Sequence, residues 1–508
     1  MLPSLLYINK ILRQATGIQP DVATDLDLAA LIDVMTDGQA GLHEKILHFF
    51  MSDIANNSED ILYRQAIIRD ALGHAEWFYL LNSTIEQAFL QYDSVRKVSQ
   101  PGYTHFIPIT EQLRTAVLLQ GILLDLVTAV SSLFSVAGHY FASSGLNDLI
   151  MAYDEFYSSE FLITFRKKYN EFKAITQESC MIIGARPGNG LKIADCQIRH
   201  IVNKWKQAKL PRGSHMIKLN SISMQAKAME MRDTLLKNIL NLVNTINHQT
   251  ACEMQQLGDE TGFYAGCLNL DRVLRRIGLP VCFPQPMPCG SLTLNFHGLI
   301  DVGLALRIGG KPVSNDLDLD DDQLIIITGA NQGGKSTFLR SIGLAQTLMQ
   351  AGLFVTAESF SARVCSGIMT HFCRAEEQSL ESGKLDEELR RIDRIIDDIQ
   401  PHALFLMNES FSSTTSHDGE VIASEIISAL LQMDTRILFV THLYNFAKNM
   451  EKSAQPHITF LRAERSDDGV RSYRIREGTA LSTSFGLDLY NRIIGDVKLA
   501  AHFGTLAE

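Results

Sequence analysis

The sequence lacks the features that mark several specialised classes of protein. Its eight cysteines form no C-x-x-C pair and no zinc-binding spacing, which indicates reduced thiols in the cytoplasm. No basic segment followed by an apolar core opens the chain, so no secretion signal is expected. Tandem repeats and low-complexity stretches are also missing. With 46% hydrophobic and 20% charged residues, the 508 residues are expected to form about two to four globular domains.

Positive charge is scarce in the C-terminal part of the chain. The formal net charge is −11, and the residues from Leu292 onward include 20 basic and 29 acidic ones, against 26 and 28 before it. A chain with this balance is not a general polyanion binder. Any contact with nucleic acid is therefore expected in the N-terminal part.

One long apolar stretch, Ala116 to Phe141, tests whether the chain crosses a membrane. It is long enough to span a bilayer, but Gln120, Asp125 and several serines lie near its middle. An acidic side chain is costly inside a bilayer. We therefore expect a buried helix of a long bundle and no membrane contact.

Up to about residue 290 the pattern of apolar residues is helical. Residues 1–105 are predicted to form short amphipathic helices, for example at Asp27–Met35 and Gly41–Ser52. Residues 106–290 are predicted to form longer helices near Thr110–Phe141, Asp148–Cys180 and Ser221–Ile277. The last of these needs a partner helix along its length, which indicates a lever or a coiled arm.

A domain boundary is predicted after these helices. Cys282–Pro288 holds three prolines and is interpreted as a linker. The sequence that follows is β-rich at Leu292–Phe296 and Leu304–Ile308. We therefore expect a domain of mixed α and β structure from residue 291 to 508.

The stretch from Leu324 to Thr337 carries the strongest chemical signal. Four apolar residues predict a strand buried on both faces, and G-x-x-x-x-G-K-S follows before a helix. Such a loop points its N–H groups at a phosphate chain, with Lys335 placed to reach the β- and γ-phosphates and Ser336 to ligate Mg²⁺. The predicted site for ATP and Mg²⁺ consists of Gly329, Ala330, Asn331, Gln332, Gly333, Gly334, Lys335, Ser336 and Thr337.

Two further predicted strands end in residues that complete this site. Strand 403–407 ends in Asn408 and Glu409, where phosphate-loop enzymes carry an acid near Mg²⁺ and a glutamate that positions the attacking water. Asn408 brings no charge to the metal, so we expect slow hydrolysis with Glu409 as the catalytic group. Strand 436–440 precedes His442, whose imidazole is predicted to contact the γ-phosphate.

Residues 199–218 are strongly basic, with six lysines and arginines, no acidic residue, and Trp205 among them. They could follow DNA phosphates with one stacking aromatic, or form a solvated hairpin or loop. Leu210–Met216 also resembles the remnant of a protease-cleavage site, and we interpret it as native sequence. The residues predicted to contact DNA are Arg199, Lys204, Lys206, Lys209, Arg212 and Lys218.

Several motifs together resemble those of the MutS mismatch-repair ATPases. The resemblance is strong over about residues 292–495 and weaker but collinear over about 55–290. Thr328–Thr337 is similar to the family's phosphate loop, and Ala351–Ala357 to the stretch after it. Thr414–Gly419 resembles the segment after the family's acidic pair. Thr441-His442 resembles its histidine switch, and Ser484-Phe485-Gly486 its last motif.

The resemblance implies a multidomain chain with an all-α core and lever domain followed by an α/β P-loop ATPase domain of ABC type. The domains implied are 1–105, 106–290 with a reduced DNA clamp near 199–218, and 291–508. A homodimer with shared ATP sites is also implied, with Ser382 and Asp418 at the dimer interface. No counterpart of the family's mismatch-reading domain is expected, so the DNA partner is mismatched, branched or otherwise structured duplex, with DNA shape favoured.

The chain departs from the family's pattern at three places near the ATP site. Asn408 replaces the acid of the metal site, Phe411–Ser413 replaces a Gly-Arg-Gly turn, and Glu381–Glu388 lacks the family's Ser-Thr pair. An alternative therefore stays open, in which the chain is a nucleotide-gated interaction or structural protein with negligible hydrolysis. A membrane-transport ATPase has little in its favour.

Overall fold

The computed structural model describes residues 2–9, 15–98, 107–137, 140–178, 180–187, 193–202, 222–373, 383–453, 456–465 and 471–480. The chain forms two compact units. Residues 1–5 and 74–261 belong to the first, the helical unit, and residues 6–73 and 262–508 to the second, the sheet unit. The boundaries predicted near residues 105 and 290 do not coincide with these divisions, because residues 6–73 pack with the C-terminal part of the chain.

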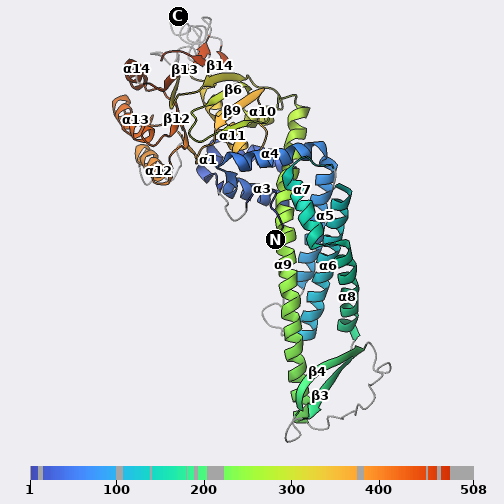
Figure 1. The fold of residues 1–508 in the computed structure, drawn as a ribbon. Helices are drawn as coiled ribbons and strands as arrows, with labels where there is room; N and C mark the ends of the chain where they lie inside the picture. Colours follow the sequence, from blue (N-terminus) through green and yellow to red (C-terminus); the bar gives the residue numbers. More distant parts are fainter. Residues whose placement is uncertain are drawn as a thin grey trace, which may run out of the picture. The chain divides into compact units, whose positions relative to one another are not determined.

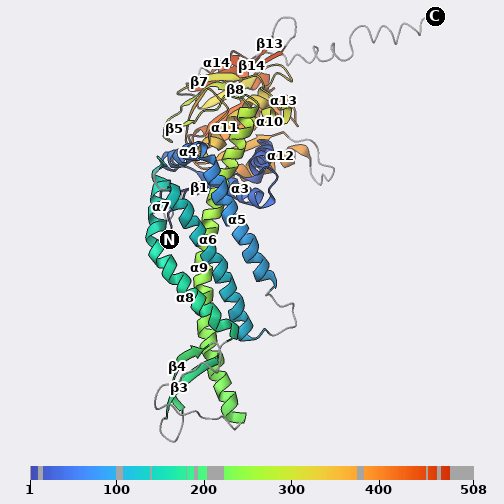
Figure 2. The same cartoon turned by 90° about the vertical axis from the view of Figure 1, so that its right-hand side faces the viewer.

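The helical unit is built from long helices and one hairpin. Figures 1 and 2 show the helices running side by side, with the antiparallel strands β3 and β4 at one end of the bundle. The helix predicted at Ser221–Ile277 is confirmed by α9, which begins and ends within one residue of it. The described elements are α5 (Ala75–Val98), α6 (Ile109–Ala137), α7 (Ser144–Phe156), α8 (Ser159–Glu178), β3 (Cys180–Pro187), β4 (Ile193–Val202) and α9 (Ile222–Arg276) as far as residue 261.

The single helix predicted at Asp148–Cys180 is two helices in the structure. α7 ends at Phe156, and the Ser158 hydroxyl accepts the N–H of Phe161 at 3.3 Å in the first turn of α8. A serine in this position satisfies an N–H that the first turn of a helix leaves unpaired. The chain therefore starts a new helix there.

By length and composition, α6 is the one helix of the described chain that could cross a membrane, and 56% of its most apolar window is buried. The helix packs against α5, α7 and α8. Tyr153 of α7 donates to the Val127 carbonyl at 3.0 Å, and Arg166 of α8 forms an ion pair with Asp125. These contacts agree with the expected helix of a long bundle.

A six-stranded sheet forms the centre of the sheet unit. Its neighbouring strands are parallel, except that β13 and β14 are antiparallel. All of β8 is buried, and it confirms the strand predicted before the glycine-rich loop. The predicted strands at 403–407 and 436–440 correspond to β11 and β12. The order is β10 (Ile368–Phe372), β11 (Leu404–Asn408), β12 (Arg436–Val440), β8 (Leu324–Thr328), β13 (Ile458–Arg465) and β14 (Arg471–Glu477).

Helices cover both faces of this sheet (Figure 1). On one face, a core that includes Phe405, Phe439 and Phe446 packs against α12 (Lys384–Asp398), α13 (Ser416–Leu431) and α14 (Tyr444–Lys452). On the other face, Leu406 lies against Gly343 of α11 (Lys335–Gln350). Because β8, β11 and β12 are parallel, the residues that follow them meet at one edge of the sheet.

A second sheet has four strands, in the order β5 (Gln285–Met287), β9 (Ser359–Arg363), β6 (Leu294–Leu299) and β7 (Asn315–Leu319). The stretch interpreted as a linker thus contributes a strand, which corrects the prediction. β5 lies at the edge of the sheet and pairs only with β9 among the described strands. An edge strand tolerates Pro286, which has no N–H to donate.

The β-rich prediction at Leu304–Ile308 is wrong, because these residues belong to α10 (Val302–Ile308). The Asp301 side chain accepts the N–H of Leu304 at 2.9 Å, and Gly309 ends the helix at φ 61°. An aspartate at the start and a left-handed glycine at the end are ordinary helix caps. The strand predicted at 292–296 is confirmed in part by β6.

Residues 6–73 pack against the rest of the sheet unit. The Thr370 hydroxyl of β10 donates to Asp25 at 2.7 Å, and Gln350 at the end of α11 donates to the Ala55 carbonyl at 2.9 Å. The short helices predicted from the sequence are confirmed as α2 and α3. The elements of this segment are β1 (Ala15–Thr16), α1 (Pro20–Asp25), α2 (Leu28–Thr36), α3 (Ala40–Ser52), β2 (Ile54–Ala55) and α4 (Ser58–Gly73).

The chain just beyond α11 is held by α4. Gly352 has a φ of 84°, and a Cβ atom added to it would lie 2.4 Å from the Cβ of Arg64. Arg64 is fully buried and donates to the carbonyls of Leu6 and Asp53, both at 2.8 Å. The helix that begins at the glycine-rich loop therefore ends against a fixed part of the N-terminal segment.

Candidate functional site

The loop between β8 and α11 is glycine-rich and tightly curved. Gly329 and Gly334 have φ values of 115° and 90°, which residues with side chains rarely adopt. A Cβ atom added at Gly329 would lie 2.9 Å from the nitrogen of Ala463, and one added at Gly333 would lie 2.7 Å from its Cβ. The glycines are therefore required both by the backbone conformation and by the close approach of β13.

Lys335 opens α11, and its side chain is buried beneath the loop. Its Nζ donates to the carbonyls of Gly329 and Ala330 at 3.0 and 3.1 Å. Burial lowers the pKa of Lys335, the charge of Glu409 raises it, and that of Arg471 lowers it again. Both carbonyls are neutral, so a phosphate group would give this ammonium the anionic partner that a buried charge requires.

Ser336 and Asn408 face one another across the end of the sheet. The Ser336 hydroxyl donates to Oδ1 of Asn408 at 2.9 Å, so two neutral oxygens lie side by side. Mg²⁺ prefers such hard oxygen ligands and usually completes its shell with water and phosphate oxygens. Within the described residues, no three His, Cys, Asp or Glu side chains are grouped to hold a metal. The donor set therefore fits Mg²⁺ held mainly by a nucleotide.

Glu409 follows β11 in a left-handed backbone conformation, φ 56°, and its N–H donates to the Val440 carbonyl at 2.8 Å. Its Oε1 lies 3.1 Å from Nε2 of His442. A carboxylate only accepts hydrogen bonds, so Nε2 carries the proton. This hydrogen bond is the main reason why the pKa of Glu409 is below its ordinary value; burial opposes it, and the charges of His442 and Lys335 support it.

A cavity of about 570 Å³ opens beside these groups. One part of its wall is polar and comes from the glycine-rich loop with Lys335, Ser336 and Glu409. Another part is mostly apolar and consists of Leu299, Leu304, Ile308, Pro312 and Val313. A cavity with these two kinds of wall suits a ligand with a flat ring at one end and phosphates at the other.

The other residues predicted for the triphosphate also lie on this loop. Ala330 is buried, Asn331 and Gln332 are exposed, and Thr337 is half-buried in the first turn of α11. Gln332 has a φ of 56°, so the tip of the loop is left-handed at a residue with a side chain. Together they place the predicted loop residues in one continuous turn at the N-terminus of α11.

Most residues predicted to contact DNA or a second subunit fall outside the described chain. Arg199 lies in β4, whereas Ser382 of the predicted dimer interface is outside the described ranges. Asp418 is exposed in the first turn of α13, where the Thr415 hydroxyl accepts its N–H at 3.2 Å. The remaining predicted DNA contacts, also outside the described ranges, are Lys204, Lys206, Lys209, Arg212 and Lys218.

The sequence did not predict the contacts that the β13–β14 hairpin makes with the loop. A Cβ atom added at Gly334 would lie 3.3 Å from the Tyr473 carbonyl oxygen, and Arg471 donates to Oε1 of Gln332 at 3.2 Å. No motif marks these residues, which lie more than a hundred positions from the loop along the chain. The pairing of β13 with β8, and of β14 with β13, brings them there.

Comparison with known families gives two matches that together cover most of the chain. The family model described as MutS domain V matches residues 325–495. The model described as the MutS2 N-terminal domain matches residues 56–277. The first match contains the loop, Asn408, Glu409 and His442, and the second contains most of the helical unit.

Individual relatives are similar over part of their length. A DNA mismatch repair protein MutS from Prochlorococcus marinus (strain AS9601) is 33% identical over 184 residues, 35% of this chain and 20% of the relative. A MutS protein from Solibacter usitatus is 32% identical over 270 residues, 49% of this chain and 31% of the relative. DNA mismatch repair protein Msh3 of Homo sapiens is 30% identical over 227 residues, 41% of this chain and 20% of the relative. The matched regions thus span between a fifth and a third of these relatives.

Proposed function

Because the chain belongs to the MutS family, we propose that it is an ATP-dependent DNA-binding protein with a P-loop ATPase of ABC type in its C-terminal part. The observation that carries the proposal is the meeting of Lys335, Ser336 and Glu409 around one cavity at the carboxyl ends of parallel strands. Ligands of open parallel sheets bind at this edge.

The residues of the site divide into binding and catalytic groups. Residues 329–337 hold the phosphates, with Lys335 giving up its two carbonyl partners for phosphate oxygens. Ser336 and Asn408 would hold Mg²⁺, which when bound neutralises phosphate charge. Glu409, kept as a carboxylate by His442, accepts a hydrogen bond from the attacking water and orients it.

Asn408 favours slow turnover and supports a second candidate function. Its amide holds its hydrogen bond to Ser336 but contributes no negative charge to the metal site. If hydrolysis is negligible, the nucleotide acts only as a ligand that changes the protein's conformation, and the chain is a nucleotide-gated interaction protein. The two functions share the same cavity and differ in whether phosphate is released.

DNA is the proposed macromolecular partner. The relatives are named DNA mismatch repair proteins, and the residues 199–218 carry six positive charges with no negative one. A basic stretch of this kind follows phosphates without reading sequence. The proposed ligand is therefore mismatched, branched or otherwise structured duplex, bound by a cytoplasmic homodimer with Ser382 and Asp418 at the subunit interface.

The proposal is tested by nucleotide and DNA binding to the purified protein. ATP binding should be lost in Lys335→Ala and kept in Lys448→Ala, which removes a half-buried lysine on α14 that pairs with Glu451. DNA binding should depend on salt and change when ATP is added to wild type but not to Lys335→Ala. Unchanged ATP affinity in a folded Lys335→Ala protein would contradict the assignment of the nucleotide site. Absence of DNA binding in both nucleotide states would leave the interaction protein as the better description.

A further inference from the structure

The β13–β14 hairpin lies across the glycine-rich loop at three positions. Ala463 of β13 approaches Gly329 and Gly333, and Tyr473 of β14 lies over Gly334. Between them, Arg471 at the start of β14 donates from Nη1 to the side chain of Gln332 at 3.2 Å. The hairpin thus carries one cation to the tip of the loop.

Two features of Arg471 bear on a role in binding a ligand. Its Nε is buried and has no hydrogen-bond partner within the described residues. The same guanidinium is close enough to Lys335 for its charge to lower the pKa of that lysine. Two cations close together in a partly buried site are costly unless an anion joins them. Glu409, the acid whose charge acts on Lys335, already accepts a hydrogen bond from His442.

We propose that Arg471 is a second phosphate-binding residue, which contacts the phosphate chain of the bound nucleotide together with Lys335. A guanidinium presents five N–H donors in a fixed fork that matches phosphate oxygens. Among the residues that the structure describes, its Nε has no hydrogen-bond partner, and Nη1 would exchange only the amide oxygen of Gln332 for a phosphate oxygen. The inference rests on the proposed binding of ATP.

A competing role for Arg471 is to hold the tip of the loop through Gln332. The two roles differ in what Arg471→Ala does once Gln332 has already been shortened. If Arg471 acts through Gln332, adding Arg471→Ala to Gln332→Ala causes no further loss of nucleotide affinity. If Arg471 binds phosphate itself, the double variant binds ATP more weakly than Gln332→Ala alone, because the guanidinium is lost as well.

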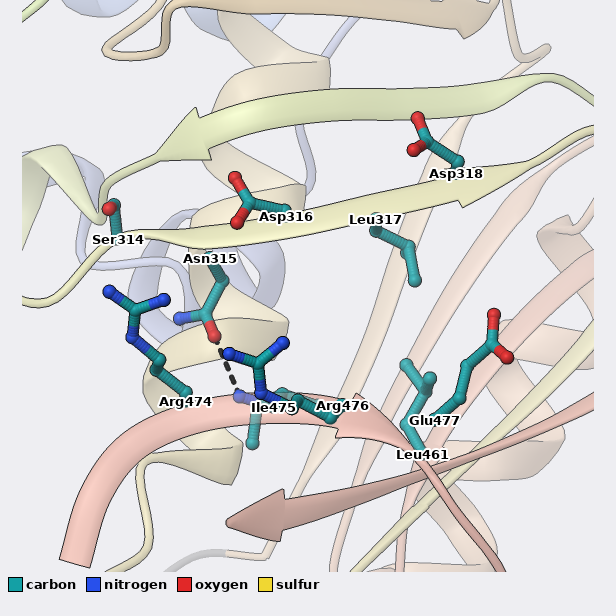
Figure 3. A pocket seen from close by; sticks show the side chains of 10 residues that line it. All are labelled: Ser314, Asn315, Asp316, Leu317, Asp318, Leu461, Arg474, Ile475, Arg476 and Glu477. Carbon is teal, nitrogen blue, oxygen red and sulfur yellow. Dashed lines mark hydrogen bonds between the residues drawn. The ribbon is translucent and has the colours of Figure 1, made fainter.

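The same strand offers a matched control. Arg474 is exposed and projects into a separate cavity of about 400 Å³ between β14 and β7, as Figure 3 shows. The N–H of Ile475 next to it donates to Oδ1 of Asn315 at 2.7 Å, which fixes the strand independently of either arginine side chain. Arg474→Ala therefore removes one positive charge from β14 without touching the glycine-rich loop.

The test is to measure dissociation constants of ATP, ADP and AMP for wild type, Arg471→Ala, Arg471→Lys, Gln332→Ala, the double variant Gln332→Ala with Arg471→Ala, and Arg474→Ala. We expect Arg471→Ala to bind ATP about 10- to 100-fold more weakly, the loss of one or two charged hydrogen bonds. The loss should be larger for ATP than for AMP. Arg471→Lys keeps the positive charge without the forked donors, so its affinity for ATP should lie between those of wild type and Arg471→Ala. The affinity of Arg474→Ala should match that of wild type.

Thermal unfolding of each variant shows whether it is folded, and Arg471→Lys tests the site if the alanine variant is not. Wild-type ATP affinity in folded Arg471→Ala, or a double variant that binds ATP as well as Gln332→Ala alone, overturns the inference while the proposed nucleotide site stands. An equal loss for ATP and AMP also overturns the assignment to the phosphate chain. Failure of wild type to bind any nucleotide would overturn the proposed function and this inference with it.

Discussion

Asn408 and Glu409 are adjacent in the chain but are expected to affect turnover in opposite ways. Glu409→Gln keeps the shape of the side chain and removes the carboxylate that would orient water, so phosphate release should fall about 10²- to 10⁴-fold with ATP affinity unchanged. Asn408→Asp restores a charge beside Ser336 and should give equal or faster release. Steady-state phosphate release with Mg²⁺ measures both.

Glu425→Gln, an exposed position on α13, is the control for this pair of variants. It removes the same charge far along the helix and should release phosphate like wild type. If wild type itself is no faster than Glu409→Gln, the chain does not hydrolyse ATP at this site and the nucleotide-gated alternative holds.

The Glu409–His442 pair predicts a pH dependence with a definite sign. The hydrogen bond from His442 lowers the pKa of Glu409 from its ordinary 4.5. The carboxylate is therefore stabilised above its ordinary pKa, and this stabilisation is lost as the pH falls through the lowered value. In His442→Ala the acid limb of the hydrolysis profile should move to higher pH. His417→Ala removes an exposed imidazole in the first turn of α13 and should leave the acid limb unchanged.

The measurement is phosphate release between about pH 4 and pH 8, normalised to each variant's own maximum. Normalisation separates the position of the acid limb from any loss of rate caused by removing the imidazole. An acid limb at the same pH in His442→Ala and wild type would show that the hydrogen bond does not set the protonation of Glu409.

At the scale of the elements, the end of α11 offers a sharp test of packing. Gly352→Ala meets two penalties: a left-handed φ of 84° and a Cβ 2.4 Å from that of Arg64. Gly278→Ala meets only the first, since its φ is 72° and nothing lies within 4 Å of the added atom. We expect a loss of about 1 kcal/mol in unfolding free energy for Gly278→Ala and roughly 1–3 kcal/mol more for Gly352→Ala.

Urea unfolding of the two variants, followed through the sheet unit, gives this comparison. The difference between the two losses isolates the contact with α4, because both share the strained backbone. Equal losses would mean that Arg64 yields to the added atom and that α4 does not fix the end of α11.

The elements that follow from local patterns were predicted well. The buried strand and loop at 324–337 and the long helix α9 each depend on residues close together in sequence, and both are confirmed. The β-rich prediction at Leu304–Ile308 is wrong because Asp301 and Gly309 cap a helix at this short apolar run. Local reasoning therefore errs where a short apolar run suits either structure.

Contacts between distant segments were beyond the reach of the sequence. Gln350 meets Ala55 across 295 positions, and Arg471 meets Gln332 across 139. Neither Gln350 nor Arg471 belongs to a motif, and glutamine and arginine are common on surfaces. The chemistry of the glycine-rich loop was recognisable from its own residues, whereas the hairpin beside it was not.

At the scale of the whole molecule, the uneven charge predicts how DNA binding should respond to salt. Replacing Lys204, Lys206 and Lys209 with glutamine should weaken binding to all duplexes and flatten the salt slope by about one unit per lost phosphate contact. The matched control replaces three exposed lysines elsewhere in the helical unit, Lys97, Lys167 and Lys168.

The slope is measured as the change of the logarithm of the binding constant with the logarithm of salt concentration. The control should leave it near the wild-type value, because those lysines lie on α5 and α8 outside the basic stretch. An unchanged slope in the first set, or an equal change in both, would make residues 199–218 an ordinary solvated surface.

The division of the chain has a consequence for its synthesis on the ribosome. Leu6–Gly73 belongs to the sheet unit, but its partners begin only at Gly262, after the 188 residues of the helical unit from His74 to Thr261. At about 5–20 residues per second, translation of this insertion takes roughly 10 to 40 s. During that time Phe49 lacks Phe263, on which its ring stacks in the folded chain. The apolar side chains of the nascent N-terminal segment that pack on later residues therefore stay without those partners until the insertion has been translated.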